Sequence, residues 1–205
     1  MTESIDFKKT YKSFYAPPKK PVIVEVPKFK YLKIDGKGDP NVSPLFQEAI
    51  GLLYPLSYAM RFTIKKQRDL AYTVMPLEGL WWADDMATFI GKNKDQWNWT
   101  LMIMQPDFIT EQMVVKARAE VIRKKKLQKV HKVRFEPYQA GTCVTMMHIG
   151  LYDDETENIA WMHRFAQEQG YLLDGLHQEI YLSDFRKTAP EKLKTVLRQP
   201  VRKTD

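Results

Sequence analysis

The order of apolar and polar residues divides the chain into short strands and three longer helices. Residues 28–34 alternate between the two kinds of side chain, which places successive side chains on opposite faces of a strand. Residues 97–104 likewise place Trp97 and Trp99 on one face. The full set of predicted strands is 22–26, 28–34, 71–75, 97–104, 130–135, 142–148, 177–183 and 195–201. The last of these contains Pro200, which favours an edge position.

Three segments carry the start and stop signals of helices. The first, 43–67, begins with Ser43 as N-cap and Pro44 in the first turn, and it is apolar nearly all round. The second, 110–126, ends in a basic run that suits the negative end of the helix dipole. The third, 156–169, ends before a glycine.

The elements follow one another in the same order twice: strand, glycine turn, helix, strand, strand. We therefore predict an α+β domain over residues 22–205, with halves at about 22–126 and 127–205. Residues 1–21 precede it as an arm whose prolines favour extended backbone. Aromatic residues in the arm, Tyr15 among them, indicate that it packs back onto the domain.

The stretch 175–184 carries the most suggestive chemistry. Strand alternation places His177, Glu179 and Tyr181 on one face. It places Ile180 and Leu182 on the other face. We expect the apolar face to press against a helix layer, which leaves Glu179 on the face away from the core. There it is either a solvated surface charge or the anionic group of a ligand cleft.

Composition limits the classes of function. The formal net charge is +7, but the basic residues are scattered and no DNA-reading motif accompanies them, so direct nucleic-acid binding is not expected. The single cysteine, Cys143, fits a reducing compartment and lies in an apolar run, where a buried thiol is inert. With a polar N-terminus and no long apolar stretch, we expect a cytoplasmic protein without membrane contact.

Catalytic and metal-binding signatures are sparse, whereas aromatic residues are dense. The four histidines lack the spacing of a metal site, so no metal or other cofactor is predicted. Adjacent Trp81 and Trp82 follow a Leu-Glu-Gly turn, so at least one should reach a cleft. Aromatic walls beside a carboxylate suit planar hydrophobic or cationic small molecules. The predicted ligand contacts are Tyr54, Tyr72, Trp81, Trp82 and Trp99.

Several motifs in fixed order carry a family resemblance. They are residues 34–40 (IDGKGDP), 76–82 (PLEGLWW), 104–106 (MQP), 134–136 (RFE) and 179–184 (EIYLSD). From about residue 7 to 202 the chain resembles stand-alone members of the GyrI-like small-molecule-binding family. The resemblance implies two strand-helix-strand-strand units about a pseudo-twofold axis, with an antiparallel sheet and a central ligand cleft. It also matches Glu179 to a pocket glutamate that meets cationic drugs.

A similarity to cyclopropanoid cyclopropyl hydrolases within the family implies detoxification of DNA-alkylating xenobiotics. In that chemistry Glu179 would act as base or water anchor, while Tyr181 and His177 would donate to a developing phenolate oxygen. The sequence departs from the usual pattern at Gln178, commonly His, and Phe185, commonly Pro. Two alternatives stay open: a multidrug-binding module that sequesters or senses ligands without chemistry, and an interaction protein like gyrase inhibitors, whose protein partner is unknown.

Overall fold

The computed structural model describes residues 3–84 and 93–204, and the chain forms two compact units. Unit 1 comprises Met1–Phe7, Phe29–Met75 and Trp82–Tyr138, whereas unit 2 comprises Lys8–Lys28, Pro76–Trp81 and Gln139–Asp205. The units interleave along the chain. Two long strands, β2 (Val22–Lys37) and β6 (Arg134–Ile149), contribute residues to both.

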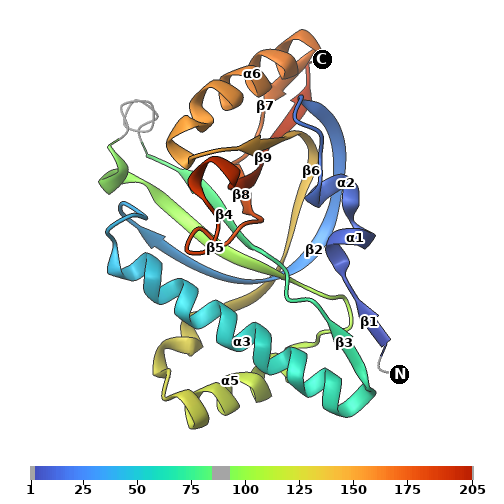
Figure 1. The fold of residues 1–205 in the computed structure, drawn as a ribbon, viewed down its shortest axis with the longest axis vertical. Helices are drawn as coiled ribbons and strands as arrows, with labels where there is room; N and C mark the ends of the chain where they lie inside the picture. The colour runs from blue at the N-terminus through green and yellow to red at the C-terminus, as the bar shows by residue number, and fades with distance from the viewer. Residues whose placement is uncertain (1–2, 85–92, 205) are drawn as a thin grey trace. The chain divides into compact units, whose positions relative to one another are not determined.

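Unit 1 is built on two helices and two strand pairs. Helix α3 (Pro44–Arg68) and helix α5 (Glu111–Lys125) lie side by side (Figure 1). The second half of β2 pairs antiparallel with β5 (Asn98–Gln105). Two short strands, β1 (Glu3–Ile5) and β3 (Leu70–Tyr72), pair in parallel. The described residues of this unit also contain the 3₁₀ turns η1 (Lys94–Gln96) and η2 (Gln128–Lys132).

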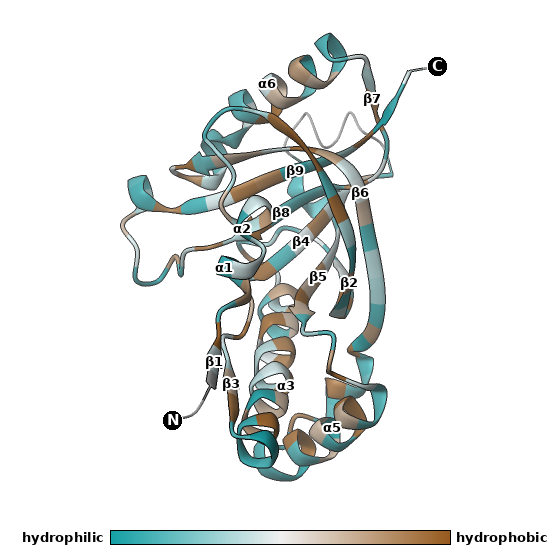
Figure 2. Ribbon diagram, turned by 90° about the vertical axis from the view of Figure 1, so that its right-hand side faces the viewer, coloured by the Kyte–Doolittle hydropathy of each residue, from teal (hydrophilic) through white to brown (hydrophobic). Residues whose placement is uncertain are grey.

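Strand β5 forms the centre of unit 1. Every residue from Trp99 to Gln105 is buried, so the strand is covered on both faces, and its apolar middle is brown in Figure 2. Gln105 ties it to α3 by donating to Ser57 Oγ at 3.2 Å. Helix α5 begins after its N-cap Thr110, whose Oγ1 accepts from the backbone N–H of Met113.

Unit 2 is an antiparallel sheet with one long helix. Strand β9 (Lys194–Lys203) pairs with β6, with β7 (Tyr171–Leu173) and with β8 (His177–Tyr181), and β8 pairs in turn with β4 (Leu77–Trp82). Helix α6 (Glu155–Glu168) crosses this sheet. The short elements are α1 (Phe7–Thr10), α2 (Lys12–Tyr15), η3 (Tyr152–Asp154) and η4 (Pro190–Lys192).

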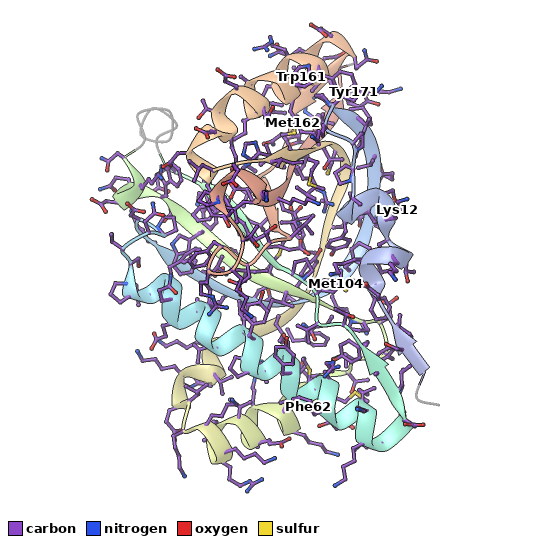
Figure 3. All side chains as sticks on the ribbon, in the orientation of Figure 1. Lys12, Phe62, Met104, Trp161, Met162 and Tyr171 are labelled. Atoms are coloured by element: carbon purple, nitrogen blue, oxygen red, sulfur yellow. The ribbon has the colours of Figure 1, made fainter. Side chains whose placement is uncertain are left out.

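The core of unit 2 lies between α6 and the sheet. Met162 and Ala166 of α6 pack on Met146 and Leu197 of the neighbouring strands β6 and β9. Figure 3 shows Met162 on the sheet side of α6 and Trp161 on its outer side, where Trp161 is 42% exposed. Met162 and Ala166 are four residues apart, the spacing of one face of a helix.

The fold is a mixed α+β fold with an antiparallel sheet, as predicted, and the three long helices lie within two residues of their predicted bounds. The pseudo-twofold relation stays a prediction. In the part of the chain that the structure describes, no helix is both long and apolar enough to cross a membrane.

Several local predictions were wrong. The segment 77–82 is strand β4 rather than a loop, because Leu77–Trp81 pairs with β8 along its whole length. Strand β9 has partners on both sides rather than being an edge, and Pro200 sits near the end of its pairing with β6. The arm contains two one-turn helices ahead of its prolines instead of only extended backbone. The first half of the predicted strand 130–135 lies in the turn η2 and only its end belongs to β6, and 22–26 and 28–34 form one strand through Pro27.

We predict that Gly36 and Gly51, both in unit 1, respond oppositely to alanine. A Cβ at Gly36 would lie 2.1 Å from the Trp99 ring, whereas a Cβ at Gly51 in α3 would meet nothing within 4 Å. Gly36→Ala should therefore lower the free energy of unfolding by about 2 kcal/mol or more. Gly51→Ala should raise it by about 0.5–1 kcal/mol, since alanine favours helix. Urea unfolding of both variants measures this; equal stabilities would contradict the packing described.

Candidate functional site

The face of β8 that carries His177, Glu179 and Tyr181 is the face that α6 covers. Glu179 pairs with Leu197 of β9 in register, and Leu197 belongs to the core beneath α6. The prediction that Glu179 points away from the helix layer was therefore wrong. The predicted placement of Glu179 and Ile180 on opposite faces of β8 is confirmed. Both faces of the strand are covered, however, and Ile180 is fully buried.

Glu179 makes two polar contacts beneath α6. Its Oε2 accepts from the Tyr181 hydroxyl at 2.7 Å, and its Oε1 lies 3.6 Å from His177 Nε2. Only 15% of its side chain is exposed. In the described part of the chain it forms no ion pair with a lysine or arginine. The carboxylate is therefore shielded from water without a fixed cation beside it.

Tyr181 holds the carboxylate in place. Its oxygen accepts from Trp81 Nε1 at 3.1 Å while its own O–H donates to Glu179. Burial, and then the negative charge of Glu179, raises the pKa of Tyr181 well above its usual value, so the phenol stays protonated and remains a donor. Gly79, opposite Glu179 in register, leaves the necessary space, because a Cβ there would lie 2.7 Å from Trp81 Nε1.

Other polar and aromatic groups surround this centre. Tyr152 packs edge-on against Tyr181 with ring centroids 5.7 Å apart, and it is 36% exposed. Burial, followed by nearby carboxylates, raises the pKa of Tyr152 to about 12. Among the described residues, both ring nitrogens of His177, Nε2 of His163 and Oγ1 of Thr195 are buried with no hydrogen-bond partner. These atoms leave hydrogen-bonding capacity unused next to Glu179.

The residues that the sequence grouped as one site belong to both units. Trp81 joins His177, Glu179 and Tyr181 in unit 2. Trp82 is half-buried, and strand alternation directs it to the opposite face from Trp81. Tyr152 and His163 were missed, because they come from a turn and a helix whose contact with β8 has no signature in the sequence.

The other three predicted contacts lie in unit 1. Trp99 is 1% exposed, with Phe46 edge-on to its ring at 5.2 Å. Tyr72 is 2% exposed and packs against Phe7 and Phe108. Both rings are used in packing in this conformation. Tyr54 is half-buried and lies beside the exposed Tyr58.

Side chains that could hold a metal do not gather in the described residues. No group of three His, Cys, Asp or Glu has the required arrangement there. Cys143 is fully buried, and burial raises the pKa of its thiol to about 12, so it carries almost no thiolate at neutral pH. The functional groups described around Glu179 are a carboxylate, a phenol, an imidazole and an indole.

Residues 19–202 match the GyrI-like small molecule binding domain. The chain belongs to this family. The match covers all of β2 through β9 except the last residue of β9, and so includes every residue described around Glu179.

Two solved structures from Listeria innocua are similar to this GyrI-like domain. An uncharacterized conserved protein is 39% identical with a TM-score of 0.90, covering 97% of this chain and 100% of its own. A protein described as a hydrolase is 38% identical with a TM-score of 0.88, and the match covers 98% of this chain and 100% of that protein's chain. The C-terminal domain of EcmrR shares the fold alone. It is 16% identical with a TM-score of 0.57, and the match covers 90% of this chain and 98% of that domain's chain. No relative was found among curated proteins.

The opposite face of the β4–β8 pair holds a second carboxylate, Glu78, which the sequence pattern had placed in a turn. Glu78 is fully buried and accepts from Tyr15 of the arm at 2.8 Å and from Gln178 Nε2 at 2.6 Å. Arg198 donates to Phe14 O at 2.7 Å and lies 3.5 Å from Gln178 Oε1. Gln178 thus joins β4 and β8 behind Glu179. The arm packs on the body, as predicted.

We predict that His163 makes the domain sensitive to acid. Burial, and then the nearby charge of His177, lowers the pKa of His163 below 6.5. The unfolded chain therefore binds this proton more readily, and the stabilising contribution of neutral His163 is present above pH 6.5 and lost as pH falls through the lowered pKa. His163→Gln should flatten the dependence of unfolding free energy on pH in that window.

Urea unfolding at a series of pH values between about 7 and 5 measures this slope. His131→Gln is the matched control, because His131 is an exposed imidazole in η2. If the slope of His163→Gln equals that of the parent, another group is responsible for the acid sensitivity.

Proposed function

We propose that this GyrI-like domain binds planar hydrophobic or cationic small molecules at Glu179 and hydrolyses an electrophilic cyclopropane in them. The observation that carries the proposal is the shielded carboxylate, 15% exposed and without a lysine or arginine partner in the described residues. A carboxylate removed from water is costly unless it meets a compensating charge or donor. A ligand can supply the positive charge or the hydrogen-bond donor that the described residues do not place beside Glu179.

Aromatic groups around Glu179 suit such a ligand. Tyr152 offers an exposed ring beside Tyr181, and Trp81 completes the wall on the β4 side. Aromatic faces attract cations and gain from the burial of flat apolar surface. Small-molecule binding is the property of the family, and the ligand class is our inference from these side chains.

Hydrolysis adds water across a strained ring bond. Water attacks a ring carbon, a C–O bond forms as the C–C bond breaks, and the electron pair moves onto a conjugated carbonyl oxygen, which becomes a phenolate. Glu179 accepts the proton that water loses, and protonation of the phenolate completes the addition. The similarity to a protein described as a hydrolase, at 38% identity, supports this chemistry.

The contacts assign different tasks to the two neighbours of Glu179. The Tyr181 O–H donates to Glu179, so in this conformation Tyr181 positions the base rather than donating to a phenolate. His177 has ring nitrogens without hydrogen-bond partners and lies 3.6 Å from Glu179. We assign to His177 the donor role at the phenolate oxygen.

One observation favours binding without chemistry. The Tyr181 O–H already donates to Oε2 of Glu179, so this oxygen is occupied by a hydrogen bond rather than by a water. The same bond leaves the negative charge available to a cationic ligand. A binding module that sequesters or senses drugs is therefore the second candidate function.

Glu179→Gln separates the two candidates. If Glu179 is a general base, ring opening of a cyclopropane-bearing alkylator should slow by about a hundredfold or more, while ligand binding stays nearly intact. If Glu179 only attracts cations, cationic ligands should bind more weakly and neutral ones should be unaffected. Product formation under multiple-turnover conditions, beside a binding titration of the same variant, distinguishes these results.

Glu157→Gln on α6 is the matched control, because Glu157 is an exposed residue outside the contacts of Glu179. It should behave as the parent in both assays. A parent protein that turns over no cyclopropane-bearing compound would exclude the hydrolase and leave the binding module.

A further inference from the structure

Unit 1 contains a groove between α3 and α5 that is separate from the contacts of Glu179. Its volume is about 420 Å³, within the range of small-molecule sites. The α3–α5 groove is lined by Tyr54, Pro55, Tyr58, Ala59, Phe62, Glu120, Val121, Lys124 and Lys125. Figure 3 shows Phe62 on the side of α3 that faces α5.

The α3 wall is a ladder of aromatic rings. Tyr54, Tyr58 and Phe62 recur every fourth residue, so they lie one above another along about 12 Å of helix. Neighbouring ring centroids are 6.4 and 6.2 Å apart, with planes within 31° and 30° of parallel. Tyr58 and Phe62 are 44% and 58% exposed, which is a large apolar surface for one helix face. The ladder therefore presents ring faces and edges to a flat ligand.

The α5 wall is basic. Lys124 and Lys125 stand in the last turn of α5, where the helix dipole also favours positive charge. The one acidic residue in the lining, Glu120, is already paired with Lys124. The Lys124 hydrogen bond, with positive charge from Arg123 and Lys66, lowers the pKa of Glu120. Cations thus outnumber the carboxylate at this edge, and Lys125 has no acidic partner in the described residues.

We propose that the α3–α5 groove binds planar aromatic acids, that is, aromatic carboxylates or sulfonates. The aromatic rings stack along Tyr58 and Phe62 while the acid group pairs with Lys125 across the groove. The helix dipole accounts for lysines at the end of α5, but it does not account for two exposed rings facing them. A flat anion satisfies both walls, and its charge is opposite to that of a cation drawn to Glu179.

Fluorescence titration with anilinonaphthalene sulfonate, a planar aromatic sulfonate, tests the assignment. The probe should bind the parent, and binding should weaken when salt is raised from about 0.05 M to about 0.5 M. Phe62→Ala combined with Tyr58→Ala should weaken binding by roughly tenfold. Lys125→Gln should weaken it by roughly two- to fivefold. These side chains are exposed, so the variants should fold normally.

Matched control variants test whether the loss of sulfonate binding comes from the α3–α5 groove. Phe185→Ala removes an exposed ring of unit 2, and Lys116→Gln removes an exposed lysine from the same helix α5; neither should change binding. Ethidium, a planar aromatic cation, should bind Lys125→Gln at least as well as the parent. Unchanged sulfonate binding in the Tyr58/Phe62 variant would overturn the proposal. So would equal loss of both probes in Lys125→Gln, or parent self-association that Phe62→Ala abolishes.

The result is independent of the proposed function. Glu179→Gln should bind the sulfonate as the parent does, because Glu179 belongs to unit 2 and the α3–α5 groove to unit 1. If Glu179→Gln abolishes sulfonate binding while the Tyr58/Phe62 variant retains it, the probe occupies the Glu179 site and the groove assignment is wrong.

Discussion

The pairing of β4 with β8 is the constraint on which unit 2 depends, because it places a shielded carboxylate on each of its two faces. Glu78 lies on one face and Glu179 on the other, one register step apart. A buried charge is tolerated only where donors or opposite charges surround it. Each face therefore has to be covered by a specific element, the arm on one side and α6 on the other.

The two carboxylates are satisfied in different ways. Glu78 receives hydrogen bonds from Tyr15 and Gln178, Gln178 in turn accepts from Arg198, and Glu78 has no contact with solvent. Glu179 receives one hydrogen bond, from Tyr181, and keeps a small exposed fraction. The first arrangement fixes the backbone, whereas the second leaves charge and hydrogen-bonding capacity to spare. Two carboxylates at adjacent register positions of one strand pair therefore differ in how fully hydrogen bonds satisfy them.

Unit 1 uses its aromatic residues for packing at the centre and exposes others at its surface. Trp99 lies over Gly36, whose missing side chain gives the indole its place. Tyr58 and Phe62 instead remain exposed beside a basic helix end. Aromatic side chains are therefore buried in the core of this unit and exposed on its surface, and the exposed fraction rather than the side-chain class distinguishes the two groups. The positive groove and the negative Glu179 site would select ligands of opposite charge.

The sequence by itself determined the features that depend on near neighbours along the chain. The helix bounds followed from caps and periodicity, the alternation of Glu179 with Ile180 followed from strand geometry, and the family followed from ordered motifs. What lies against each face was decided only by tertiary structure. Both faces of β8 are covered, so polarity did not reveal which one α6 packs on. Glu78 looked like a turn residue because the pairing that makes β4 a strand comes from β8, about a hundred positions later. Of the predicted aromatic contacts, Trp81 donates a hydrogen bond to Tyr181, the partner of Glu179, and no periodic signal in the chain marked this convergence in space.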